Sequence, residues 1–307
     1  MTGGIGRRET GEDEARPGET GSAFDRMRPR LVRIAYRMLG SVAEAEDVVQ
    51  DAYLRWHRTD QAAVSNAEAF LTRTVTRLCL DQLKSARSRR ETYIGPWLPE
   101  PIFEAEPEAG DADDLTLTLM LALERLSPLE RAAFLLHDVF GQDFDTVAEA
   151  IDREPAACRQ LAARARNHVR AARPRFPVSR DRGLEIADAF FSASRSGDVT
   201  ALRSLLAADV VAQADGGGKR PAAGRPILGD QQVARFFAGF AHKPGYEPPR
   251  ILARGLIDGL PGIVSLQAGV LQTTCFAIEG DRIAAIYVTR NPDKLRRIGA
   301  MMGVSGE

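Results

Sequence analysis

The sequence has few cysteines and histidines, and neither type is clustered. Its three cysteines, Cys79, Cys158 and Cys275, stand far apart among 307 residues, each with apolar neighbours. This spacing suits reduced thiols and does not match that of a metal site, and the four scattered histidines add none. We therefore expect no metal and no other cofactor.

Long apolar runs are also missing. No stretch reaches the length that crosses a membrane, and no signal peptide opens the chain. These absences predict a cytoplasmic protein with no membrane partner. The formal net charge is only −1, but acidic and basic residues are segregated by segment. That segregation, unlike the net charge, is compatible with a local surface for nucleic acid.

Residues 70–90 have the periodicity of one amphipathic helix. At about 100° per residue, four cations fall on one narrow stripe, and Leu71, Val75 and Leu78 fall on the opposite face. Such a stripe is either a solvated helix face or a surface that binds a polyanion. The stripe consists of Arg73, Arg77, Lys84 and Arg87.

An acidic amphipathic helix is predicted just upstream, within residues 40–58. Ser41 is expected to be its N-cap, with Glu44 as the partner in a capping box. Ala52 and Leu54 are expected to pack inward. The outward face carries Glu46, Asp47, Gln50 and Asp51.

A second basic helix is predicted from Pro155 onward. A short helix capped by Asp145 or Thr146 and ending at Ile151 precedes it across a tight turn. Two helices in this arrangement, the second rich in arginine, predict a helix-turn-helix that reads DNA in the major groove. The outward positions of its recognition helix are Arg159, Gln160, Arg164 and Arg166.

The pattern changes after residue 182. Two helices, a strand, a third helix and a run of alternating segments follow, which predicts an α+β domain ending in an antiparallel meander. The expected meander strands are 250–257, 262–267, 269–279 and 282–289.

The order of acidic helix, basic helix, linker and helix-turn-helix resembles a bacterial sigma factor. Residues 43–56, AEAEDVVQDAYLRW, are similar to sigma region 2.2, and residues 24–175 resemble an extracytoplasmic-function sigma factor. The whole chain resembles the group of that family with a fused SnoaL-like domain. Three marks of the group stand in order: WLPEP at 97–101, DGGGK at 215–219 and NPDKL at 291–295.

The resemblance implies two partners, core RNA polymerase and promoter DNA. The acidic helix would dock on the polymerase clamp. The loop containing Asn66 would capture a flipped base, and the basic stripe would hold the melted strand. The sequence departs from many members of the family at Arg77, where they have asparagine.

The resemblance also implies that the fused domain controls the other two through the three motifs. The apolar residues of WLPEP either dock into a groove or pack against the chain's own helices. Lys219 and the glycine amides of DGGGK are expected to face Glu100 or the acidic run after it, while Leu295 packs and Asp293 pairs with Lys294. The motif residues are Trp97, Leu98, Pro99, Glu100, Pro101, Asp215, Gly216, Gly217, Gly218, Lys219, Asn291, Pro292, Asp293, Lys294 and Leu295.

The predicted protein is multidomain, with two all-α sigma domains followed by an α+β SnoaL-like cone-shaped domain. Region 2 is a helical bundle and region 4 a helix-turn-helix. The expected segments are a disordered tail (1–22), region 2 (23–92), a linker (93–114), region 4 (115–176), a second linker (177–182), the SnoaL-like domain (183–290) and a C-terminal tail (291–307).

Two other functional classes are compatible with parts of the sequence. One is a helix-turn-helix activator with a ligand-sensing domain, although it needs no acidic clamp helix. The other is an enzyme built on the cone, for which Asp209, Asp258, His242 and Tyr287 are the only candidates. They form no recognisable catalytic pattern, so we predict no catalytic residues. A small-molecule ligand inside the cone stays open.

Overall fold

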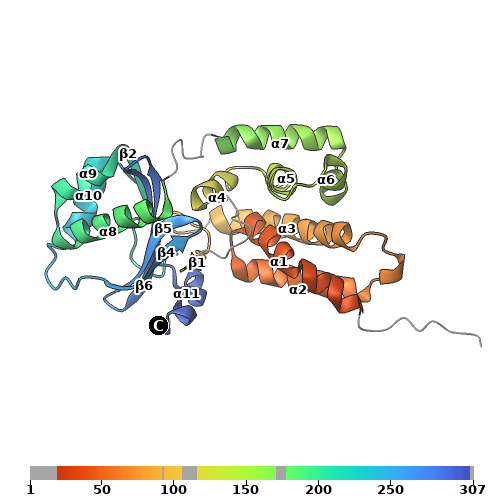
Figure 1. Cartoon of the computed structure of the whole chain (residues 1–307), viewed down its shortest axis with the longest axis horizontal. Coiled ribbons are helices and arrows are strands. Elements are labelled where there is room, and N and C mark those ends of the chain that lie inside the picture. Colours follow the sequence, from red (N-terminus) through yellow and green to blue (C-terminus); the bar gives the residue numbers. More distant parts are fainter. Residues whose placement is uncertain (1–18, 92, 106–115, 171–177, 305–307) are drawn as a thin grey trace, which may run out of the picture.

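A computed structural model describes residues 19–91, 93–105, 116–170 and 178–304, with side chains from residue 23 to 84 in the first range. Two helical domains lie beside a third domain built on a seven-stranded sheet (Figure 1). The predicted order of domains, an all-α half followed by an α+β domain, is confirmed. Within these ranges no helix is both long and apolar enough to cross a membrane.

The N-terminal domain contains α1 (Glu19–Leu39), α2 (Val42–Arg58) and α3 (Ala67–Glu91). Ser41 caps α2 as predicted, because its side chain accepts a hydrogen bond from the Glu44 amide. The expectation that Leu54 packs inward is wrong, since Leu54 is 43% exposed. The buried stripe of α2 runs through Ala52 and Trp56, and Leu54 lies outside it.

The helix-turn-helix domain follows the linker. Asp143, rather than the predicted Asp145 or Thr146, caps α6, because its carboxylate accepts a hydrogen bond from the Thr146 amide at 2.7 Å. Asp152 then takes a left-handed conformation (φ 55°) in the turn before α7. The helices are α4 (Leu117–Leu123), α5 (Pro128–Phe134), the π-helical segment η2 (Leu135–Val139), α6 (Phe144–Ile151) and α7 (Pro155–Arg170).

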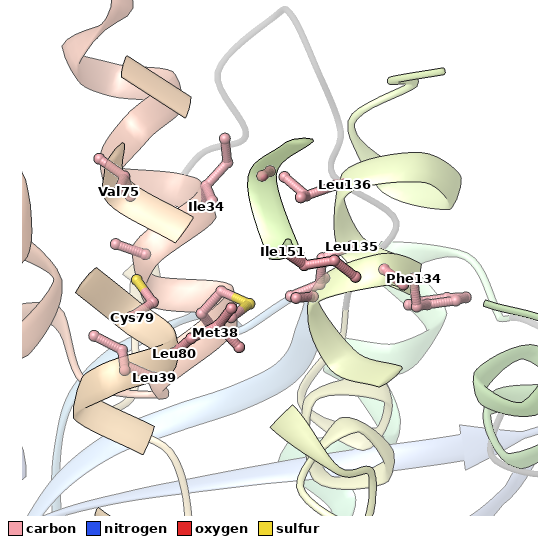
Figure 2. Packing of buried hydrophobic residues seen from close by; sticks show 14 of the residues in the cluster. Ile34, Met38, Leu39, Val75, Cys79, Leu80, Phe134, Leu135, Leu136 and Ile151 are labelled. Carbon is pink, nitrogen blue, oxygen red and sulfur yellow. The ribbon is translucent and has the colours of Figure 1, made fainter. Parts of the chain in front are cut away.

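One apolar core joins these two helical domains. Figure 2 shows Met38 and Cys79 of the N-terminal domain on one side, with Leu135 and Ile151 of the helix-turn-helix domain facing them. All four side chains are buried. Because burying one such side chain contributes about 1.5–3 kcal/mol, separating the two domains would have a large unfavourable term to overcome.

The sheet domain completes the chain. Its strands are ordered β1-β4-β5-β6-β7-β2-β3, with β2 parallel to β7 and the other neighbours antiparallel. Its strands are β1 (Phe103–Glu104), β2 (Leu206–Asp215), β3 (Ile227–Leu228), β4 (Arg250–Ile257), β5 (Leu260–Gln267), β6 (Val270–Glu279) and β7 (Arg282–Thr289). Its helices are α8 (Arg180–Ser196), α9 (Val199–Leu205), α10 (Asp230–Gly239), the 3-10 turn η3 (Pro292–Lys294) and α11 (Arg296–Met301).

The two faces of the sheet have different coverings. Helices α8 to α10 cover one face around Phe190 and Phe276. The other face packs against Leu98 and Phe103 from the linker and against Ile298 from α11. The linker therefore belongs to the sheet domain, to which it even contributes edge strand β1. Of the residues of WLPEP, Leu98 packs within the chain as one alternative expected, but in the cluster on the sheet and not only against helices.

Substitution of Gly40 tests how closely Trp97 of the linker packs against the N-terminal domain. We expect Gly40→Ala to destabilise the protein, because Gly40 has φ +74° and an added Cβ would lie 2.6 Å from Cη2 of Trp97. The left-handed conformation alone costs roughly 1–2 kcal/mol for a residue other than glycine. Gly141→Ala is the matched control, with φ +69° and open space around the new Cβ. Urea unfolding should show the larger loss for Gly40→Ala, and equal losses would contradict a tight Trp97 contact.

Candidate nucleic-acid interface and interdomain junctions

Helix α3 lies against the helix-turn-helix domain (Figure 1), and Arg73 and Arg77 of its basic stripe contact that domain. Nη1 of Arg73 lies 3.7 Å from the Glu149 carboxylate, and Nη2 of Arg77 donates to the Glu149 carbonyl at 3.2 Å. Glu149 belongs to α6. The surface predicted to hold a melted strand is thus partly occupied by the domain predicted to read duplex DNA.

The other predicted contacts to the downstream strand are more open. Asn66 is exposed and caps α3, since its side chain accepts from the Ala69 amide at 3.0 Å. Lys84 is exposed and lies 2.9 Å from Asp81 one turn earlier. The side chain of Arg87 lies outside the described residues.

Helix α7 forms an outer edge of the molecule (Figure 1). Arg159 and Gln160, near its N-terminus, are exposed. Arg164 and Arg166 bind acidic residues of other helices. Their Nε atoms donate to Glu130 at 2.7 Å and to Asp138 at 2.6 Å, respectively. Of the four predicted reading residues, Arg159, Gln160 and Arg164 are exposed, and Arg164 and Arg166 tie α7 to α5 and η2.

The acidic face of α2 is exposed at all four predicted positions, Glu46, Asp47, Gln50 and Asp51. One of them has a partner from the far end of the chain. Nη1 of Arg297, in α11, lies 3.4 Å from Oε1 of Glu46. The C-terminal helix therefore reaches the edge of the surface predicted to dock on polymerase.

The three sequence motifs meet at one buried ion pair. Nζ of Lys294 lies 2.7 Å from Oδ2 of Asp215, and the Asp215 side chain is fully buried. The same carboxylate accepts from the Leu98 amide at 3.0 Å, and Lys294 donates to the Leu98 carbonyl at 2.5 Å. Lys294 also lies over the Trp97 ring, 4.2 Å from its centroid. We call this set of contacts the lysine junction.

Tyr93 and Asn291 complete the lysine junction. The Tyr93 hydroxyl donates to Oδ1 of Asp215 at 2.6 Å, and the Asn291 amide donates to Tyr93 at 2.8 Å. Gly217 must be glycine here, because an added Cβ would lie 2.3 Å from Nδ2 of Asn291 and its φ is +60°. Of the remaining motif residues, Pro99, Pro101, Gly216 and Leu295 are buried, Pro292 is half-buried and Gly218 is exposed.

Two of the predicted pairings within the motifs are wrong. Lys219 pairs with Asp293 at 2.5 Å and not with Glu100, and most of the acidic run that was the alternative lies outside the described residues. Lys294 pairs with Asp215 and not with Asp293. The buried Glu100 instead accepts from the Val42 amide at 2.8 Å and from the Ser41 hydroxyl at 3.1 Å. An anion is stabilised there because the first amides of a helix have no partners within it.

A second junction centres on Asp258, in the turn between β4 and β5. The Tyr36 hydroxyl lies 2.8 Å from Oδ1 of Asp258 and 2.9 Å from the Glu100 carbonyl. The backbone of Asp258 pairs with Ile102 and with Leu117, at the start of α4. This aspartate junction therefore joins α1, the linker, the helix-turn-helix domain and the sheet domain.

The geometry of the aspartate junction favours a protonated carboxyl. The Tyr36 hydroxyl has one proton but two acceptors in range, so a neutral Asp258 can supply the second proton. Burial raises the pKa of Asp258 to about 7. The hydrogen bond with Tyr36, the charge of Arg37 and the Ile102 amide oppose the rise, and Glu104 adds to it. Burial and the neighbouring Asp258 also raise the pKa of Tyr36.

The four candidates for catalysis do not come together. Asp209 and His242 are exposed, Asp258 lies in its junction, and Tyr287 is buried. None of them lines the cavity between the sheet and α8 to α10. The hypothesis of an enzyme with these residues therefore lacks an assembled site.

Sequence reasoning missed Tyr36 and Tyr93, and it assigned Asp258 to a different role. Neither tyrosine stands in one of the three motifs. Each lies at the end of a predicted helix or just beyond it, where periodicity gives no indication of a distant partner. Tyr93 is four residues before Trp97, and this proximity to a motif was the one available indication.

Comparison with known proteins gives consistent matches along the chain. Residues 23–89 match the family model of sigma-70 region 2, and residues 116–169 match that of sigma-70 region 4. The chain is 38% identical to the ECF RNA polymerase sigma factor SigJ of Mycobacterium tuberculosis over 288 residues, 89% of this chain and 92% of SigJ. It is 30% identical to the probable ECF RNA polymerase sigma factor SigI of the same species over 293 residues, 92% of this chain and 97% of SigI.

The likeness extends to three dimensions. The crystal structure of Mycobacterium tuberculosis SigJ superposes with a TM-score of 0.72 at 35% identity, covering 90% of this chain and 98% of that one. A likeness of this extent covers both helical domains and the sheet domain.

The aspartate junction predicts a pH dependence of stability. Because the folded-state pKa of Asp258, about 7, exceeds the ordinary value of about 3.9, its stabilising contribution is complete below about pH 4 and is lost as pH rises to 7. The loss is at most about 1.4 kcal/mol per pH unit in this window. Asparagine tolerates the left-handed backbone at this position (φ 46°), so Asp258→Asn should fold.

Urea unfolding at pH 5, 6.5 and 8 measures this effect. Asp258→Asn should lose less stability between pH 5 and 8 than the wild type, and should be the more stable protein at pH 8. Parallel pH profiles of the two proteins would show that Asp258 is not protonated in the folded state.

Proposed function

Because the chain belongs to the extracytoplasmic-function (ECF) RNA polymerase sigma factors, we propose that it binds core polymerase through α2 and reads a promoter at two elements. The observation that carries this proposal is the division of charge. The acidic face of α2 is exposed on one side of the molecule, and the arginine-rich α7 forms another edge. In this proposal α7 reads the upstream element in the major groove. Asn66 and the basic stripe hold the downstream strand.

The proposal includes self-regulation by the sheet domain. The contacts of Glu149 with Arg73 and Arg77 belong to a closed state in which α3 is not free for DNA. The aspartate junction supports that closed state, because Tyr36 of α1 and Leu117 of α4 both bind Asp258. Opening it requires a compensating interaction, which binding to polymerase would provide.

Arg297 supports a related proposal for the C-terminal tail, which we propose acts as an inhibitory latch. Its guanidinium neutralises Glu46 at the edge of the acidic face of α2. Polymerase and Arg297 then compete for the same charge. We also propose a small-molecule ligand for the cavity of the sheet domain, whose chemical class is argued in the next section.

Charge reversal on α2 tests the polymerase contact. We expect Asp47→Lys combined with Asp51→Lys to abolish binding to isolated core polymerase, because both carboxylates are exposed and neither packs in the core. Binding of upstream-element DNA by the helix-turn-helix domain should be unchanged, which serves as the control. Normal core affinity of the double variant in a pull-down or titration would remove α2 from the polymerase contact.

Arg159 tests the reading of the upstream element. Arg159→Ala should cost about 1–3 kcal/mol on the preferred promoter and relax the preference at one base position. Arg164→Ala should have the same kind of effect only if its guanidinium leaves Glu130 to contact a base. Arg166→Ala, which removes the contact with Asp138, serves as a structural comparison. Unchanged selectivity in both Arg159→Ala and Arg164→Ala would locate the reading face elsewhere.

Arg297 tests the latch. We expect Arg297→Glu to increase run-off transcription by core polymerase about two- to fivefold, because an exposed ion pair contributes up to about 1 kcal/mol. Truncation after Leu295 should act in the same direction, whereas truncation at Arg180 should lower transcription by removing the alignment of the two helical domains. Arg296→Glu is the matched control, since Arg296 pairs with Asp293 and not with α2. No gain from Arg297→Glu or from truncation after Leu295 would exclude a latch.

A further inference from the structure

The sheet domain encloses a cavity of about 280 Å³ between its strands and helices α8 and α10. This volume lies near the lower end of the range of roughly 300–1,000 Å³ that is typical of small-molecule sites. The cavity is separate from both junctions and from the surfaces proposed for DNA and polymerase.

Aromatic side chains form one wall of the cavity. Phe190 and Phe237 meet edge to face with ring centroids 5.0 Å apart, and Phe236 contacts both Phe237 and Phe240 in the same manner. These rings come from α8, α10 and the residue after α10. A flat apolar ligand can stack on these rings or contact them edge to face.

The charged groups around the cavity all have one sign. Arg195, Lys243 and Arg290 line it, and no aspartate or glutamate of the described residues does so. Lys243 and Arg195 are exposed at the opening. Gln213, Gln272 and Thr274 add uncharged polar groups from the strands.

Arg290 is the best-placed cation for binding a ligand. It is half-buried, and its Nη1 donates to the Pro221 carbonyl at 2.6 Å. Its Nε is buried and has no hydrogen-bond partner within the described parts of the chain. Burial and the neighbouring Arg220 lower the pKa of Arg290. A guanidinium has five N–H donors, and the bond to Pro221 uses one of them, so other donors of Arg290 can bind an anionic group in the cavity.

We propose that this cavity binds a small molecule with an apolar, aromatic-compatible body and one anionic group, and that Arg290 and Lys243 bind the anion. This inference specifies the chemical class of the proposed ligand. Only the expectation that the ligand regulates transcription rests on the proposed function. An uncharged molecule would fill the apolar wall but leave the cations unneutralised, and a cation would be repelled.

A matched pair of dyes tests the chemical class. The probes are 8-anilinonaphthalene-1-sulfonate and its uncharged analogue N-phenyl-1-naphthylamine, titrated by fluorescence into the full-length protein. The sulfonate should bind saturably at one site. Arg290→Gln should reduce the affinity for the sulfonate by about tenfold relative to the uncharged dye, because a hydrogen bond to a charged group is lost. Retained binding of the uncharged dye shows that the cavity of this variant is intact.

Two further variants test the contribution of charge. Lys243→Gln, at the exposed opening, should also lower the relative affinity for the sulfonate, by about threefold since its charge is more solvated. Arg235→Gln is the charge-matched control, because Arg235 is exposed on α10 and does not line the cavity. An unchanged ratio of affinities in both Arg290→Gln and Lys243→Gln would overturn the proposal, as would failure to bind either dye.

The same preparations should be assayed for binding to core polymerase. A wild-type protein that binds polymerase but neither dye overturns the ligand inference alone. A protein that binds the sulfonate as described but not polymerase supports the ligand inference and overturns the proposed function.

Discussion

The position of the linker on the sheet domain depends on one buried ion pair, Lys294 with Asp215. The Asp215 side chain is fully buried and that of Lys294 is 13% exposed. The linker backbone at Leu98 and the hydroxyl of Tyr93 supply further hydrogen bonds to the pair. Removing one partner of such a pair typically costs about 3–5 kcal/mol, because the other charge is left buried without compensation. Lys294 is 79 positions from Asp215 and 196 positions from Leu98, so these contacts hold three distant segments of the chain in one geometry.

The closed arrangement of the helical domains has a different physical origin. Their common core is apolar, with Met38 and Leu135 among its fully buried members. Apolar contact is not directional, so it favours closure without fixing its geometry. The polar contacts of Glu149 with α3 and the two junctions can supply that orientation. In the proposed function, such a division would let polymerase separate the helical domains while the linker stays on the sheet.

The sequence predicted the elements of the fold better than the partners within the site. Strands β4 and β7 have the predicted bounds, because alternation of apolar residues is local information. The three motifs were expected to act together and do meet. Which lysine pairs with which acid depends on the register of distant segments, so Lys219 and Lys294 received the wrong partners. Asp258 was considered only as a catalytic residue, because its burial between domains has no local pattern.

The cavity and the lysine junction share the ends of the same two strands. Ala214 lines the cavity, while Asp215, the next residue, enters the junction. Likewise Arg290 lines the cavity, and Asn291 beside it binds Tyr93. The amides of Arg290 and Asn291 both donate to the Asp215 carbonyl. A ligand that shifts these strand ends cannot do so without moving a junction residue, which gives the cavity a direct physical connection to the arrangement of the domains.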